Sequence, residues 1–66
     1  MNREELRAEI ARKNISKKQI AEELGITSTA LYNKMSGRCE FKESEIRKLI
    51  AILELSAEAV NNIFLS

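Results

Sequence analysis

Four polar side chains between residues 28 and 33 carry the groups of this chain best suited to recognising another molecule. Ser28 and Thr29 bring hydroxyls, Tyr32 a phenol and Asn33 an amide. Each of these groups can both donate and accept hydrogen bonds, and none is charged near neutral pH. They favour recognition by hydrogen bonding and shape over acid, base or nucleophilic chemistry.

The rest of the chain offers little for catalysis or metal binding. The 66 residues include no histidine and one cysteine, Cys39, so neither a zinc site nor an intrachain disulfide is expected. A general base at neutral pH would need a carboxylate or lysine with a shifted pKa. We expect the ten acidic residues to be scattered over solvated faces, with no evident pair. We therefore expect no enzyme, no metal, no cofactor and no redox role for Cys39.

The charge is unevenly distributed along the chain. Residues 12–38 hold six basic and two acidic side chains, net +4, whereas residues 1–11 carry net −1 and residues 39–66 carry net −2. The basic segment includes the four polar side chains described above. A basic patch on an otherwise balanced chain favours a polyanionic partner, although a solvated helical surface explains the charge alone equally well.

No targeting or membrane segment is expected. No apolar run approaches the roughly 18–20 residues of a membrane span. The start, MNREEL, carries acids and no apolar h-region of a signal peptide. With its single thiol, the chain is expected to be cytoplasmic and to have no membrane contact.

The spacing of apolar residues predicts an all-α fold. Proline is absent, glycine occurs only as Gly25 and Gly37, and apolar residues recur at helical spacing. We expect one domain, residues 1–66, forming a compact bundle of five short helices. Their expected ranges are roughly 3–13, 16–24, 28–35, 43–54 and 57–64.

Local patterns mark where these helices begin and end. The expected N-caps are Asn2, Ser16, Thr27 and Ser56. Glu5 and Gln19 would complete capping boxes with the first two, and Asn14 and Gly25 suit left-handed ends. The side chains expected to face the core are Leu6, Ile10, Ile20, Ala21, Leu24, Leu31, Met35, Phe41, Ile46, Leu49, Ile50, Leu53, Val60, Ile63 and Phe64.

Helical geometry turns two of the polar side chains away from the core. With Leu31 at the centre of the buried face, Thr29 lies about 160° and Asn33 about 200° around the helix. Tyr32 lies on the flank and Ser28 at the tip. The residues before this helix fit a helix-turn-helix: Ala21 allows close helix approach, Gly25 makes the turn, and apolar residues fill the angle. A helix that projects from the protein surface in this way fits the major groove of B-DNA, about 12 Å wide.

The segment ISKKQIAEELGITSTALYNKMSGR resembles the helix-turn-helix of the lambda-repressor-like (Cro/C1-type, XRE-like) family, which includes phage repressors and Cro proteins. The stretches SGRCEF, SEIRKLIAILELS and VNNIF resemble the same family, so the resemblance covers residues 2–65. It implies a bundle of five helices in which helices 2 and 3 form the helix-turn-helix and the third is the recognition helix. It also implies a transcriptional regulator of double-stranded DNA, most similar to short phage regulators.

The resemblance assigns base contacts to the recognition helix. It places Ser28, Thr29 and Asn33 at base edges, and Tyr32 at bases or backbone. Physically, Asn33 can form a bidentate pair with adenine, and the Thr29 methyl can meet a thymine methyl.

Phosphate contacts are expected on both sides of that helix. The expected residues are Lys17, Lys18, Lys34, Ser36 and Arg38, which would neutralise phosphates and set the register. Lys17 stands where the family commonly has a glutamine, so it can hold a phosphate by charge but cannot form that amide's second bond. Lys42 stands where a threonine cap is expected, so the fourth helix could begin at Ser44.

The partner is expected to be operator DNA, bound by a weak homodimer. Ile52 and Leu65 lie outside the core stripes, so the dimer surface is expected to run from Ile52 through Val60 to Leu65; the alternative is that they make satellite core contacts. We expect no small-molecule ligand, with regulation by concentration as in Cro-like switches. The alternative function is a protein-interaction or antitoxin-type helix-turn-helix module.

Overall fold

Residues 1–65, which the computed structural model describes, form the predicted all-α fold. Within this range the chain folds into five helices and no strand. They are α1 (Arg3–Lys13), α2 (Lys17–Leu24), α3 (Ser28–Ser36), α4 (Glu43–Leu53) and α5 (Ala57–Phe64). The helix bounds agree with the expected ranges to within one residue. None of these helices is long and apolar enough to cross a membrane.

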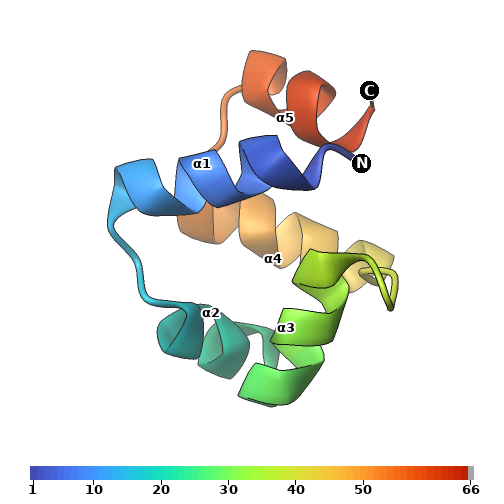
Figure 1. Ribbon diagram of the computed structural model, residues 1–66. Helices are drawn as coiled ribbons and strands as arrows, with labels where there is room; N and C mark the ends of the chain where they lie inside the picture. Colours follow the sequence, from blue (N-terminus) through green and yellow to red (C-terminus); the bar gives the residue numbers. More distant parts are fainter. Residues whose placement is uncertain (66) are drawn as a thin grey trace.

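The helices pack against one another in pairs that together form one bundle (Figure 1). α1 packs against α5 on one side and α4 on the other, and α4 in turn packs against α2. α3 packs against α2 at the end of the molecule away from α5, while both chain ends lie near α5. The Cα radius of gyration is 10.7 Å, close to the value of about 10.8 Å for a compact chain of this length. The arrangement leaves one long side of α3 uncovered.

Most helix ends follow the local patterns. Ser16, Thr27 and Ser56 each accept a hydrogen bond from the amide three residues on, at 3.0–3.1 Å. Asn14 and Gly25 end α1 and α2 with φ angles of 55° and 71°. α4 ends the same way at Glu54, with φ 50°, which the sequence did not predict because glutamate rarely adopts this conformation.

One expectation about helix starts is wrong, and one alternative is ruled out. The Asn2 side chain caps α1 through the Glu5 amide, but the Asn2 N–H donates to the Ile63 carbonyl at 2.6 Å rather than to the Glu5 side chain. That bond ties the start of the chain to α5. α4 begins at Glu43, the start of the expected range, and not at Ser44, and the Glu45 carboxylate accepts the N–H of the N-cap residue Lys42 at 2.8 Å.

The core is aliphatic and is built mainly from the expected residues. The buried side chains are Leu6, Ile10, Ile20, Ala21, Leu24, Leu31, Met35, Phe41, Leu49, Leu53 and Ile63. Four residues expected to face inward are only half-buried: Ile46, Ile50, Val60 and Phe64. These four lie on α4 and α5, which pack against other helices more than against each other, so their apolar faces remain partly open.

Candidate nucleic-acid interface

The turn between α2 and α3 is short and held by backbone hydrogen bonds. The Gly25 N–H donates to the Glu22 carbonyl at 3.1 Å, and the Ile26 N–H donates to the Ala21 carbonyl at 3.0 Å. Thr27 then caps α3 at once. Because Leu31 and Met35 are buried, the opposite side of α3 faces solvent. The turn therefore presents a nine-residue helix with one free side.

The expected base-reading side chains lie on this free side. Ser28 and Thr29 are exposed, and the Tyr32 residue is 65% exposed. Asn33 is half-buried rather than pointing fully outward. The following loop is tied to this turn, because the Arg38 N–H and the Cys39 N–H donate to the Asn33 carbonyl at 2.9 and 3.2 Å.

A hollow of about 160 Å³, the α3 hollow, brings part of this side together with α1 and α2. It is lined by Arg7, Lys17, Ser28, Leu31, Tyr32, Met35 and Ser36. Two cations and three hydroxyls thus surround a floor of two apolar side chains. Cations and hydroxyls suit an anionic oxygen, and an apolar floor suits the carbon face of a sugar. The hollow could therefore accept a sugar–phosphate unit.

The expected phosphate contacts divide into exposed and enclosed residues. Lys17 and Lys18 are exposed at the start of α2, and Ser36 and Arg38 are exposed at the end of α3. Of these, Lys17 and Ser36 also line the α3 hollow. Lys34 differs from the expectation: its side chain is 11% exposed, and its ammonium lies 2.5 Å from a Glu45 carboxylate oxygen. A lysine held in this way is not placed to contact a phosphate.

Glu45 is a polar residue that the sequence interpretation missed. It is 6% exposed, and its Oε1 accepts hydrogen bonds from Lys34 Nζ and from the Lys42 N–H. Burial by itself raises the pKa of the Glu45 carboxyl, but these two hydrogen bonds and the two lysine charges outweigh it, so the pKa lies below its ordinary value. The acids are therefore not all on solvated faces. The sequence did contain a signal for this contact. Glu45 is the third helical residue after the N-cap Lys42, the position from which a glutamate side chain accepts the N-cap N–H.

Two arginines of α1 also hold α3, and the sequence interpretation gave them no role. Arg3 Nε donates to the Lys34 carbonyl at 3.1 Å, and Arg7 Nη2 donates to the Met35 carbonyl at 3.0 Å. The last carbonyls of a helix lack intrahelical partners and carry partial negative charge. Arg3 and Arg7 lie four residues apart on one face of α1, but no local pattern says which helix end they meet.

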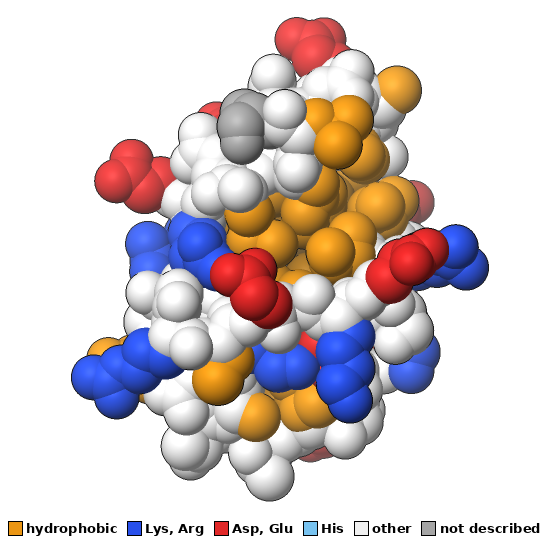
Figure 2. Space-filling view, turned by 90° about the vertical axis from the view of Figure 1, so that its right-hand side faces the viewer, with side chains coloured by type: hydrophobic (Ala, Val, Ile, Leu, Met, Phe, Trp, Pro, Cys, Tyr) orange, Lys and Arg blue, Asp and Glu red, His pale blue; other side chains and the backbone are white. Residues whose placement is uncertain are grey.

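The expected dimer residues differ in their surroundings. Ile52 packs against the core, so the alternative of a satellite core contact is correct for this residue. Val60 is half-buried, and Leu65 is 75% exposed. Figure 2, which views the side where both chain ends lie, shows a continuous apolar area bordered by both acidic and basic side chains, with further Lys and Arg side chains below it. An apolar surface suitable for a partner is therefore present on this side of the molecule.

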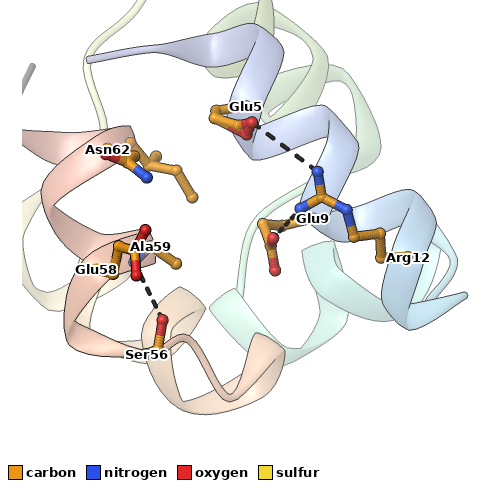
Figure 3. Close-up of a pocket in the computed structure, with 8 residues that line it drawn as sticks. Glu5, Glu9, Arg12, Ser56, Glu58, Ala59 and Asn62 are labelled. Carbon is orange, nitrogen blue, oxygen red and sulfur yellow. Dashed lines mark hydrogen bonds and ion pairs between the residues drawn. The ribbon is translucent and has the colours of Figure 1, made fainter.

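A second hollow, of about 270 Å³, lies between α1 and α5 (Figure 3). It is lined by Glu5, Glu9, Arg12, Ser56, Glu58, Ala59, Asn62 and Ile63. The Arg12 guanidinium forms ion pairs with Glu5 and Glu9, and Ser56 accepts the Ala59 N–H. In the described part of the chain no three His, Cys, Asp or Glu side chains form a group that could hold a metal ion. This hollow is a mostly polar surface in which Arg12 is paired with Glu5 and Glu9.

The chain was compared with protein families, curated proteins and solved structures. The chain matched no protein-family model, no curated protein and no solved structure. Its function must therefore be inferred from the residues and their geometry.

Proposed function

We propose that this protein is a sequence-specific transcriptional regulator of double-stranded DNA, a cytoplasmic phage or prophage repressor of the Cro-like kind. In this proposal α2 and α3 form a helix-turn-helix, and α3 enters the major groove. The observation that carries it is the free side of α3, where Thr29 and Tyr32 are exposed and the exposed cation Lys17 lines the same hollow as Ser28 and Tyr32. Polar side chains in the middle of a helix can hydrogen-bond base edges, and cations at its flanks can neutralise phosphates.

The dimensions of α3 support this placement. Thr29 and Asn33 are one turn apart, about 6 Å along the helix axis, which is roughly two base-pair steps. They can therefore read base pairs about two steps apart while Lys17 and Arg38 contact phosphates. Each good base contact contributes about 1–3 kcal/mol of discrimination. A single module reads a short site, so we propose a two-fold dimer on a palindromic operator, with half-sites roughly 34 Å apart.

The role of α3 is tested by selection from a randomised duplex library, with the wild-type protein and with Asn33→Ala. We expect an inverted repeat to be enriched, and Asn33→Ala to relax one base pair in each half-site at a cost of about 1–3 kcal/mol. Lys48→Ala is the matched control: Lys48 is exposed on α4, and its replacement should not change the selected sequence.

A second candidate is a protein-interaction or antitoxin-type module, which the apolar area in Figure 2 supports. Protein-binding surfaces are typically anchored by aromatic and aliphatic side chains. If no sequence is enriched and DNA binding weakens with salt equally for every duplex, the regulator proposal is wrong. The interaction module then becomes the better explanation.

A further inference from the structure

Glu45 is a buried charge in a small aliphatic core. Among residues 1–65 it is the one polar residue that is buried, and it is 6% exposed. Removing a carboxylate from water is costly, and a buried ion pair often contributes less to stability than apolar side chains of the same size. Its stabilising contribution alone therefore does not explain why the pair occupies this place. A buried pair can, however, fix the relative geometry of the elements that it joins.

The partner of Glu45 is a residue of the proposed recognition helix. Lys34 lies on α3 about 100° around the helix from Asn33. Its ammonium is 2.5 Å from Glu45 Oε1, and the same oxygen accepts the Lys42 N–H at 2.8 Å. Glu45 thus joins the start of α4 to one side of α3. A side chain held off the helix axis resists rotation of the helix about that axis.

The main chain of α3 is held at the same turn from another direction. The Lys34 carbonyl accepts Arg3 Nε at 3.1 Å, and the Met35 carbonyl accepts Arg7 Nη2 at 3.0 Å. The two arginines come from α1, whereas Glu45 comes from α4. Lys34 is therefore fixed twice, through its carbonyl by α1 and through its ammonium by α4. Together these contacts fix the position of this turn along the axis of α3 and its rotation about that axis.

We propose that Glu45 is a positioning residue: by holding Lys34 it fixes the rotation of α3, and so sets where Thr29 and Asn33 meet the base edges. This inference rests on the proposed function. It assigns Lys34 a role within the protein instead of a phosphate contact. Glu45 touches no DNA, so its effect on sequence discrimination would act entirely through the orientation of α3.

The test is Glu45→Gln, measured on the selected operator and on a scrambled duplex of equal length at one salt concentration. Glutamine keeps the shape and an oxygen for the Lys42 N–H, but removes the charge that holds Lys34. Loss of a negative charge should leave binding to the scrambled duplex unchanged or stronger. Operator binding should weaken, so we expect the ratio of the two dissociation constants to fall about five- to tenfold.

Glu58→Gln is the matched control, because it makes the same charge change at an exposed site on α5. It should leave the ratio unchanged. If Glu45→Gln strengthens binding to both duplexes equally, the positioning role is overturned and only a charge effect remains. If the wild-type protein does not discriminate between the duplexes, the proposed function is wrong instead.

A double variant, Lys34→Met with Glu45→Gln, keeps the inference testable if Glu45→Gln alone unfolds. It removes the buried ammonium together with its partner, so no unpaired charge remains in the core. We expect a folded protein by thermal unfolding and a ratio lowered to a similar extent. A folded double variant with the wild-type ratio would contradict the role of the pair in positioning α3.

Discussion

At the scale of single residues, Glu45 determines how the protein should respond to acid. Its carboxylate accepts two hydrogen bonds in a buried place, from Lys34 and from the Lys42 N–H, and its folded-state pKa is lowered as a result. In the unfolded chain the carboxyl has its ordinary pKa of 4.5. The ionised form therefore stabilises the folded state above that pH, and this contribution is lost as the pH falls through the lower folded-state pKa.

This linkage predicts a difference between the wild-type protein and Glu45→Gln. The free energy of unfolding of the wild type should fall further than that of the variant between about pH 6 and about pH 2, since glutamine does not titrate. Urea unfolding followed by circular dichroism measures both. Glu58→Gln, at an exposed position, should follow the wild type. Parallel curves for wild type and Glu45→Gln would show that the pair does not contribute to acid sensitivity.

At the scale of elements, the turn between α2 and α3 depends on the backbone conformation of Gly25. Its φ of 71° is in the left-handed region, and a Cβ added there would meet nothing within 4 Å. A substitution at this position should therefore cost backbone strain alone. The other contacts of the turn, such as the Ile26 N–H to Ala21 carbonyl bond, should survive it.

We expect Gly25→Ala to destabilise the fold by about 1–2 kcal/mol, the cost of a left-handed alanine. Gly25→Asn should cost less, because asparagine tolerates this region. Thermal or urea unfolding of the two variants measures the difference. Equal costs for both residues, or a cost well above 2 kcal/mol for alanine, would mean that the turn rearranges instead of straining.

At the scale of the whole molecule, the partly open apolar surface of α4 and α5 is suited to binding another protein chain. The half-buried Ile46, Ile50, Val60 and Phe64 lie on these two helices, and the exposed Leu65 follows α5. In the proposed function this surface joins two copies of the chain, so that two α3 helices read an inverted repeat.

Leu65→Lys should therefore weaken operator binding by about tenfold or more, with little change in the stability of the monomer, because Leu65 is already exposed. Ala11→Lys adds the same charge at an exposed site on α1 and should not weaken binding. Sedimentation with and without the operator gives the number of chains bound. An unchanged dimer in Leu65→Lys would place the interface elsewhere.

The sequence by itself determined the helices and most of the core, because both depend on contacts within a few residues. The caps Ser16, Thr27 and Ser56 bond amides three positions on, and the burial of Leu6 and Ile10 follows from helical spacing. The exposure of Thr29 was predictable for the same reason, since it lies opposite Leu31, whereas Asn33 lies on the same side and is half-buried.

Only the tertiary structure decided what holds α3 in place. The bonds from Lys34, Arg7 and Arg3 join groups 11, 28 and 31 positions apart. A long cationic side chain can reach solvent, a carboxylate or a helix end, and the choice depends on how the helices cross. Lys34 was therefore predicted on phosphate and is instead paired with Glu45. Local rules fix which way a residue faces on its own helix, whereas the packing of the helices decides what it meets there.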